Sequence, residues 1–172
     1  MGGRRRRRNL RVYLEWMKDM AWIEGTEEQT FVVNKGYDEV ANYFSDPAEF
    51  KRCLSDLESA EEVEPMVWRW QLKEKSEKGI TFRADYTVAY KASDGKVEWE
   101  TREGNMRSEG IARFKKLSDE RTEVNYRETI ATDLPVARLL AKVFGPIVAR
   151  EIRRGVGSFL DASRDWLENG SK

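Results

Sequence analysis

The sequence predicts an α+β domain in which a curved antiparallel sheet of about six or seven strands packs around a long C-terminal helix. Two observations on its 172 residues lead to this prediction. From about residue 57 to residue 131, apolar and polar residues alternate with a period of two, which is typical of strands with one buried and one wet face. After residue 135 the apolar residues recur at the spacing of one helical face.

The formal net charge of zero conceals two unlike parts of the chain. Residues 1–18 hold seven basic residues and one acidic residue, a net charge of +6, and five of the arginines form Arg4–Arg8. The other 24 basic and 30 acidic residues give the rest of the chain −6. We therefore expect a basic leader at 1–25, flexible or partly helical, before a domain at 26–170. Three interpretations of the leader stay open: an arm for an anionic surface, a floppy extension, or sequence upstream of the true start.

The composition excludes several classes of site. The chain has no histidine and one cysteine, Cys53, so it has no Ser-His-Asp or Cys-His pair, no His-ligated metal and no internal disulfide. We expect neither a metal nor a cofactor. No run reaches the roughly 18 apolar residues of a membrane span, and charges interrupt residues 10–23 too often for a secretory signal. We therefore expect a cytoplasmic protein.

The domain is expected to open with one strand and two short helices. Residues 30–34 are rich in residues that favour strands. Residues 38–44 have the pattern of a short helix with three apolar side chains on one face. Asp46 is placed to cap a second helix that begins at Pro47 and ends near residue 54.

The central strands should each present one apolar row to the core. The rows are Trp68, Trp70 and Leu72; Ile80, Phe82, Ala84, Tyr86, Val88 and Tyr90; Val97 and Trp99; Ala112 and Phe114; and Val124, Tyr126 and Ile130. Turn-forming residues at 93–95 and 118–120 separate neighbouring rows. Consecutive strands joined by such short turns predict an antiparallel sheet.

The apolar stripe of the last helix runs from Val136 to Leu167, about 32 residues. Gly145-Pro146 should kink this helix, or divide it into a short helix and a long one. The stripe keeps its phase across that pair, so both parts should face the same surface.

Several segments carry a resemblance to a known superfamily. They are Phe31-Val32-Val33-Asn34-Lys35, Asp38-Glu39-Val40, Tyr43-Phe44-Ser45-Asp46-Pro47, Trp68-Arg69-Trp70, Gly110-Ile111-Ala112-Arg113-Phe114, Arg121-Thr122-Glu123-Val124 and Leu134-Pro135. In these segments and in the order of its elements, the chain resembles the START-like, helix-grip (SRPBCC) superfamily over about residues 28–167, and in detail its polyketide cyclase/dehydrase and lipid-transport branch. The resemblance implies an apolar cavity between sheet and helix. Its expected lining is Trp68, Trp70, Phe82, Tyr86, Trp99, Phe114, Tyr126, Glu128, Phe144, Ile147 and Val148.

Glu128 is the candidate catalytic or anchoring residue because its parity places it on the inner face of the sheet. A carboxyl group in an apolar cavity would have a raised pKa and could act as an acid or base with Tyr126 or Tyr86, or hold a ligand hydroxyl. Two alternatives stay open: an irregular strand could turn Glu128 to water, or an arginine at the cavity mouth could pair with it. The aromatic rows could also fill the cavity instead of lining it.

The main functional hypothesis is binding or transport of a hydrophobic small molecule that is lipid-, polyketide- or isoprenoid-like, without catalysis. One alternative is a cyclase or dehydratase that uses Glu128 and a tyrosine, without metal or histidine. The other is an interaction module for a protein or ribosome, in which Arg4–Arg8 of the leader contact the anionic partner.

Overall fold

The computed structural model describes residues 21–77, 79–136 and 138–170. Most of the predicted leader, residues 1–20, lies outside this part. The proposed role of Arg4–Arg8 at an anionic surface therefore stays a prediction.

The chain begins with β1 (Ala21–Val33), α2 (Tyr37–Ser45), α3 (Pro47–Phe50) and the 3₁₀ turn η1 (Lys51–Cys53). The middle of the chain forms β2 (Leu57–Glu64), β3 (Val67–Leu72), β4 (Lys75–Glu77), β5 (Ile80–Phe82), β6 (Asp85–Ser93), β7 (Lys96–Gly104), β8 (Met106–Ser118) and β9 (Arg121–Leu134). The chain ends with α4 (Arg138–Asn169), a helix of 32 residues.

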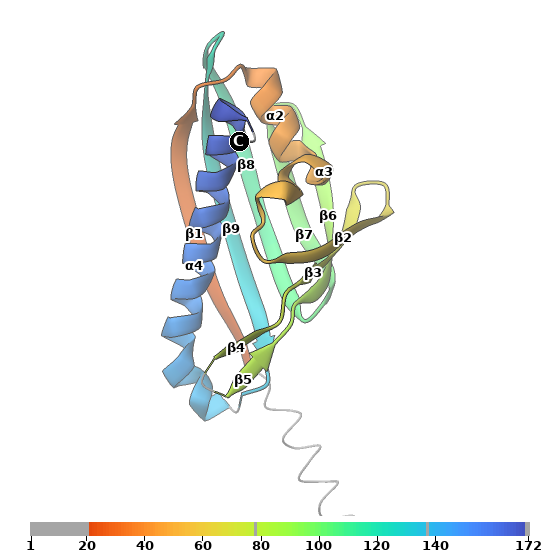
Figure 1. The fold of residues 1–172 in the computed structure, drawn as a ribbon, viewed down its shortest axis with the longest axis vertical. Coiled ribbons are helices and arrows are strands. Elements are labelled where there is room, and N and C mark those ends of the chain that lie inside the picture. Colours follow the sequence, from red (N-terminus) through yellow and green to blue (C-terminus); the bar gives the residue numbers. More distant parts are fainter. Residues whose placement is uncertain (1–20, 78, 137, 171–172) are drawn as a thin grey trace, which may run out of the picture.

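Seven strands form one antiparallel sheet in the order β1-β9-β8-β7-β6-β3-β2, and β4 and β5 pair separately as a small hairpin. Figure 1 shows α4 along the inner side of this sheet, with α2 and α3 beside the end of the helix that carries the C-terminus. The predicted fold class, a curved antiparallel sheet with a long C-terminal helix and two short helices after the first strand, is confirmed. The turns predicted at 93–95 and 118–120 also join consecutive strands.

The first strand is longer than the sequence predicted. β1 begins at Ala21 instead of Thr30 and pairs with β9 in unbroken register from Ala21↔Leu134 to Val33↔Thr122. Its inward positions include Ile23 and Gly25, and a glycine weakens the apolar alternation that marks a strand. Glycine is needed here because a Cβ at Gly25 would lie 2.8 Å from the carbonyl oxygen of Ala149 in α4. Residues 21–25 therefore belong to the sheet, although they fall within the predicted leader.

Three other boundaries differ from the predictions. The apolar row at 80–90 is divided between β5, which pairs with β4 in the small hairpin, and β6 of the main sheet, with Arg83 and Ala84 between them. The second short helix ends at Phe50 and continues only as the turn η1. The helix α4 runs through Pro146 without dividing. A proline inside a helix removes one backbone hydrogen bond, and the apolar stripe continues beyond it.

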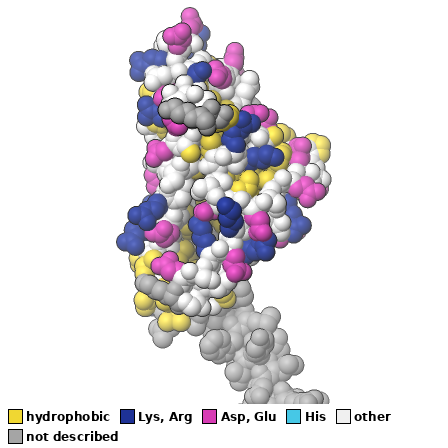
Figure 2. Space-filling model, viewed as in Figure 1, with side chains coloured by type: hydrophobic (Ala, Val, Ile, Leu, Met, Phe, Trp, Pro, Cys, Tyr) yellow, Lys and Arg dark blue, Asp and Glu magenta, His cyan; other side chains and the backbone are white. Residues whose placement is uncertain are grey.

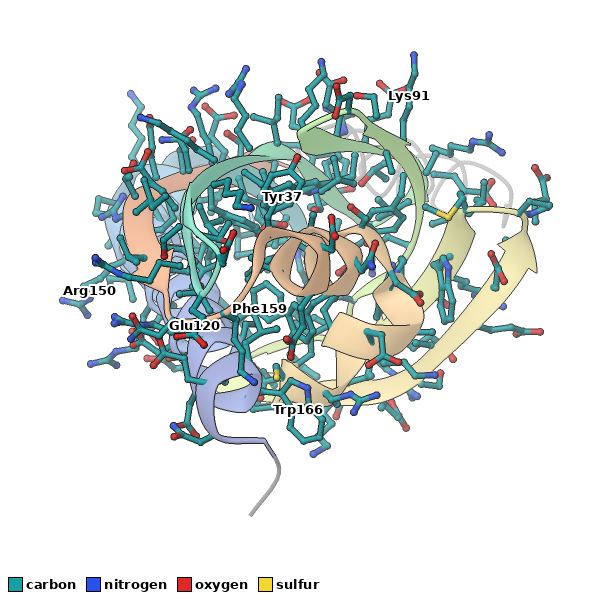
Figure 3. All side chains as sticks on the ribbon, turned by 90° about the horizontal axis from the view of Figure 1, so that it is seen from above. Tyr37, Lys91, Glu120, Arg150, Phe159 and Trp166 are labelled. Carbon is teal, nitrogen blue, oxygen red and sulfur yellow. The ribbon has the colours of Figure 1, made fainter. Side chains whose placement is uncertain are left out.

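The core lies between the inner face of the sheet and the helices α2 and α4. Aromatic rings form its centre, with Phe44 beside Phe114 at 6.0 Å and Phe159 beside Phe50 at 5.8 Å between ring centroids. Seen from above, the sheet curves around Phe159, while Arg150 and Lys91 point outward (Figure 3). A smaller apolar cluster of Ile23, Leu134 and Val136 lies at the other end of the sheet, where Ile80 and Phe82 of the β4–β5 hairpin pack against it.

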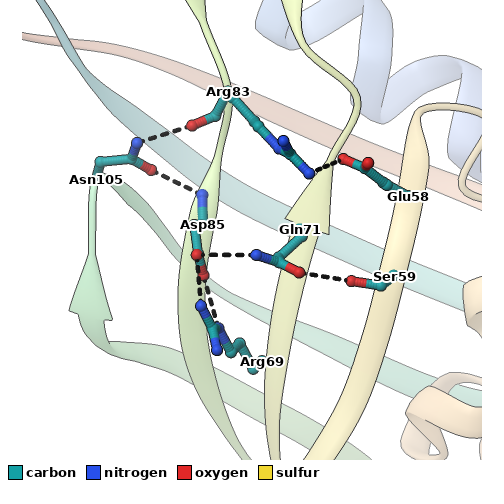
Figure 4. A network of polar contacts seen from close by, with 7 residues as sticks. All are labelled: Glu58, Ser59, Arg69, Gln71, Arg83, Asp85 and Asn105. Carbon is teal, nitrogen blue, oxygen red and sulfur yellow. Dashed lines mark hydrogen bonds and ion pairs between the residues drawn. The ribbon is translucent and has the colours of Figure 1, made fainter.

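The outer face of the sheet is polar. A network of hydrogen bonds and ion pairs joins β2, β3 and β6 to the turn before β8 (Figure 4). Arg69 donates from Nε and Nη2 to the two carboxylate oxygens of Asp85 at 2.9 and 2.7 Å, and Gln71 donates to the same carboxylate at 3.0 Å. Asn105 fixes the backbone on both sides of Ala84, since it donates to the Arg83 carbonyl and accepts from the Asp85 amide. Figure 2, which views the molecule from the side of α4 and not from the outer face of the sheet, also shows acidic and basic side chains interspersed.

The strand β2 forms one edge of the sheet, and four of its eight residues are glutamates: Glu58, Glu61, Glu62 and Glu64. Arg83 pairs with Glu58, and Arg102 pairs with Glu64 at 3.0 Å. Among the described residues, every helix falls short of the length and apolar content that crossing a bilayer requires.

Candidate functional site: a cavity between the sheet and α4

A cavity of about 360 Å³ lies between the inner face of the sheet, the β4–β5 hairpin and α4. Its walls are mainly aromatic and aliphatic. Most of the sheet contributes to it, from Trp70 on β3 to Ile130 on β9, and α4 contributes residues between Phe144 and Phe159. The cavity exists because the β4–β5 hairpin and the first half of α4 close over the sheet without their side chains filling the space between.

The structure places nine of the eleven predicted residues around this cavity: Trp70, Phe82, Tyr86, Trp99, Tyr126, Glu128, Phe144, Ile147 and Val148. The other two, Trp68 and Phe114, lie in the core beyond it. Trp68 stacks on Trp70 with 5.8 Å between ring centroids and has the Lys51 ammonium over its ring. Phe114 packs against Phe44 of α2. Both share the parity of the lining residues, but at this end of the sheet Phe44 of α2 packs on Phe114 and Lys51 of η1 covers Trp68.

Glu128 is part of a chain of four hydrogen-bonded side chains in the cavity wall. The indole N–H of Trp99 donates to Ser108 Oγ at 3.1 Å, and the Ser108 hydroxyl donates to Glu128 Oε1 at 2.6 Å. The Tyr126 hydroxyl donates to Glu128 Oε2 at 2.8 Å. The pairing of Glu128 with Glu27 and Gly110 continues the regular register on both sides of β9. The strand is therefore regular here, and Glu128 points inward instead of turning to water.

Burial raises the pKa of Glu128 above its ordinary value, and the hydrogen bonds from Ser108 and Tyr126 only partly oppose this effect. Burial also raises the pKa values of the phenol groups of Tyr86, Tyr90 and Tyr126, and the charge on Glu128 adds to each shift. The three tyrosines therefore keep their protons at any ordinary pH, and of these four groups Glu128 is the one that can gain or lose a proton.

Gly110 determines where Trp99 lies. A Cβ at Gly110 would meet Cζ2 of the Trp99 ring at 2.3 Å and the Arg127 carbonyl oxygen at 2.4 Å. Because glycine leaves this space empty, the indole ring packs against Gly110 and its N–H reaches Ser108. Only a residue without a Cβ permits this close approach.

Sequence reasoning missed Ser108, which supports the carboxylate of Glu128. The inner face of β8 carries Met106, Ser108, Gly110 and Ala112, so the alternation starts before Ala112. The predicted row began only at Ala112, because the serine and the glycine before it add nothing to an apolar alternation. Parity counted backward from Ala112 would have placed Ser108 on the inner face.

The cavity mouth is charged. Asp56, Lys73, Lys75, Glu77 and Glu151 line it, together with the thiol-bearing Cys53. Lys75 pairs with Asp56, and Arg154 outside the mouth pairs with Glu151 at 3.5 Å. No group of three or more acidic or thiol side chains within the described ranges is arranged to hold a metal ion.

Solved structures of distantly related sequence share this fold. The Zhui aromatase/cyclase from Streptomyces sp. R1128 has a TM-score of 0.66 at 16% identity, over 84% of this chain and 94% of that chain. A START superfamily protein from Mycobacterium smegmatis has a TM-score of 0.65 at 13% identity, over 85% and 99% of the two chains. Norcoclaurine synthase from Thalictrum flavum, solved with dopamine and hydroxybenzaldehyde, has a TM-score of 0.56 at 12% identity, over 88% and 91%.

No protein-family model and no curated protein matches the sequence. Structural similarity at such low sequence identity establishes the fold but not the activity. The resemblance drawn from the sequence is confirmed at this level: the chain has the START-like helix-grip fold.

Proposed function

We propose that this protein binds a hydrophobic small molecule in the cavity between the sheet and α4. The observation that carries the proposal is the cavity, about 360 Å³ with mainly apolar walls and a few polar groups gathered around Glu128. Concave apolar sites with a few convergent polar groups are typical of small-molecule binding. The START superfamily protein and the norcoclaurine synthase solved with two small molecules support this function by their fold. Lipids, polyketides and isoprenoid-like molecules are the classes to test.

A panel of these molecules, followed by native mass spectrometry, tests the proposal. Residues that line the cavity provide one optical and one chemical readout of binding. Trp70 and Trp99 line it, so a bound molecule should change the tryptophan fluorescence. Cys53, the one cysteine of the sequence, also lines it, so a bound molecule should slow its reaction with a thiol reagent. If no member of the panel binds and the Cys53 labelling rate never changes, the proposed function is wrong.

A cavity-blocking variant separates binding in the cavity from binding elsewhere. Gly155 lines the cavity, and a Cβ built there meets no atom within 4 Å. Gly155→Phe should therefore fold and should weaken binding by at least about tenfold, which corresponds to about 1.4 kcal/mol. Gly145→Phe is the matched control, because Gly145 lies on the same helix with equal space but outside the cavity wall. Equal affinity in the two variants would place the ligand elsewhere.

A second candidate function is proton transfer on a bound molecule by Glu128. The specific observation is a carboxyl group of raised pKa in the cavity, within 2.8 Å of the Tyr126 hydroxyl. Such a group can act as a general base for a substrate with an acidic C–H bond. The aromatase/cyclase among the structural neighbours supports this class of reaction. Tyr86, whose pKa the charge on Glu128 also raises, is the alternative donor.

Proton transfer can be measured without the natural substrate. The flat ketone 2-tetralone has exchangeable α-protons, and the protein should accelerate their exchange for deuterium, followed by NMR. Glu128→Gln should abolish the acceleration, because the amide cannot accept the proton. An exchange rate that is the same with wild type, with the variant and with buffer would exclude this function.

A further inference from the structure

The carboxylate of Glu128 lies in the cavity wall, partly buried, without a cation beside it. Its two hydrogen-bond partners, Ser108 and Tyr126, are neutral, and no described Lys or Arg side chain contributes to its electrostatic surroundings. A buried carboxylate is normally paired with a positive group, because removing it from water is costly. Because none of the described Lys and Arg side chains lies beside Glu128, there is a place for a positive group supplied from outside.

The hydrogen bonds around Glu128 favour its ionised form. An indole N–H can only donate, so Trp99 fixes the Ser108 oxygen as its acceptor and directs the Ser108 proton to Glu128 Oε1. The Tyr126 hydroxyl is placed to donate to the other oxygen. The distance of 2.6 Å from Ser108 is typical of a hydroxyl that donates to a charged carboxylate. Each carboxylate oxygen has a second lone pair for a further donor.

Aromatic rings surround the same end of the cavity in a continuous series. The ring of Tyr126 lies 5.2 Å from Trp99 and 6.3 Å from Phe159, and Phe159 lies 5.8 Å from Phe50. All four line the cavity. The faces of such rings are electron-rich and attract cations, most strongly where water is excluded.

The net charge of the cavity wall is negative, like the charge of Glu128 itself. Its charged residues are two lysines, Lys73 and Lys75, and four acids, Asp56, Glu77, Glu128 and Glu151, a net charge of −2. Asp56 and Glu151 have cationic partners at the mouth, whereas Glu128 in the interior has none among the described side chains. A negative cleft with low-dielectric walls concentrates cations and repels anions.

We propose that the molecule bound in this cavity carries a protonated amine, which pairs with the Glu128 carboxylate among the rings of Tyr126, Trp99 and Phe159. This inference rests on the proposed binding function and narrows it to hydrophobic amines. The carboxylate supplies the charge, Ser108 and Tyr126 hold it in place, and the rings face the rest of the ammonium group. A neutral or acidic molecule of the same shape leaves Glu128 uncompensated.

Three probes with one skeleton test this class: 1-naphthylmethylamine, 1-naphthalenemethanol and 1-naphthoic acid, which are cationic, neutral and anionic at pH 7.5. We expect the amine to bind at least about tenfold more tightly than the alcohol, as for a hydrogen bond to a charged group, and the acid to bind most weakly. Titration calorimetry and tryptophan fluorescence measure the three affinities on the full chain.

Two variants identify the carboxylate responsible. Glu128→Gln keeps the shape and the acceptor oxygen but removes the charge, so the preference for the amine should disappear while the alcohol binds as before. Glu109→Gln is the matched control, because Glu109 lies on the outer face of the neighbouring strand β8 and is exposed. It removes the same charge from the other side of the sheet, and the preference should stay.

The pH dependence gives an independent measurement. The amine should bind more weakly as the pH falls and Glu128 takes up a proton, while the alcohol should show little change. The titratable groups that face Glu128 are Glu27, which lies opposite it on β1, Tyr126 on its own strand, and Tyr86 and Tyr90 on β6, whose phenols stay protonated. Glu151 is the one acid that α4 adds to the wall. Ser108 on β8 and Trp99 on β7 do not titrate.

The outcomes separate this inference from the function on which it rests. If the alcohol binds as tightly as the amine, or if Glu128→Gln leaves the amine preference intact, the amine class is wrong and the binding function stands. If none of the three probes binds and the wider panel also fails, both are wrong.

Discussion

Asp85 and Glu128 are carboxylates on opposite faces of one sheet, and their surroundings shift their pKa values in opposite directions. On the outer face, hydrogen bonds from Arg69, with a further one from Gln71, lower the pKa of Asp85. On the inner face, burial raises the pKa of Glu128, and neutral donors only partly offset it. The outer carboxylate has its cation within the protein, whereas the inner one has none among the described side chains. The outer pair therefore connects strands, whereas the inner acid is the group that we propose to pair with a ligand.

The largest expected difference between the two faces concerns neighbouring residues of β3. Trp70 points inward and is 2% exposed, so Trp70→Ala should lower the free energy of unfolding by about 3–5 kcal/mol. Arg69 points outward into solvent, and Arg69→Ala should cost only a small fraction of that amount, because exposed ion pairs contribute little. Urea denaturation of both variants measures the difference. Similar losses would show that the outer network supports the sheet as strongly as the core does.

Gly110→Ala should have the next largest effect, about 1–3 kcal/mol, because the added methyl group overlaps the Trp99 ring. The ring must move, and its hydrogen bond to Ser108 should be lost. Thermal unfolding measures the stability, and a changed tryptophan emission spectrum reports the displaced ring. Gly145→Ala is the control, since its Cβ has free space and alanine favours a helix. An unchanged stability of Gly110→Ala would mean that Trp99 does not depend on this glycine.

Glu128→Gln should change how stability depends on pH. Because the pKa of Glu128 is higher in the folded protein than in the unfolded chain, the folded state holds the proton more tightly. The stabilisation is therefore complete below the unfolded pKa and is lost as the pH rises to the folded value, by about 1.4 kcal/mol for each unit between them. Wild type should lose stability across this window, and Glu128→Gln should lose less. Parallel curves from denaturation at several pH values would contradict the raised pKa.

Asp85→Asn should give the smallest effect, with the opposite sign. The pKa of Asp85 is lowered in the folded protein, so its contribution is present above the unfolded value and disappears as the pH falls through the folded one. Wild type should therefore lose slightly more stability in acid than the variant does. High salt should reduce the difference because Asp85 and Arg69 are exposed. An acid response unaffected by both the variant and salt would remove the role assigned to this pair.

Strand parity predicted the inner face of the sheet well where large apolar residues alternate. It placed Tyr86, Tyr126 and Glu128 on the cavity side, where the structure has them. It failed where small residues take the inward positions. Gly25 and Gly110 accept the close approach of a helix and of a ring, and a glycine adds nothing to an apolar pattern.

The hydrogen-bonded chain around Glu128 could not be read from the sequence. Ser108 and Trp99 come from two other strands, and their contact with Glu128 depends on the register of β7, β8 and β9. How far the cavity extends along the strands could not be predicted from the sequence either. Trp68 and Phe114 share the parity of the lining residues, but Lys51 of η1 lies over Trp68 and Phe44 of α2 packs on Phe114. Periodicity shows on which face of the sheet a residue lies. It does not show whether that part of the face borders the cavity or is covered by other side chains.

The glutamates of β2 affect how this molecule meets other copies of itself. An edge strand offers unpaired backbone groups to any extended chain, and this is how sheets join into aggregates. A second copy that added its own β2 along this edge would bring Glu58, Glu61, Glu62 and Glu64 against the same four carboxylates. Like charges on facing strands destabilise their pairing. The acidic edge therefore opposes the growth of the sheet from one molecule into the next, and replacing Glu61 and Glu62 with threonine should make the protein aggregate more readily.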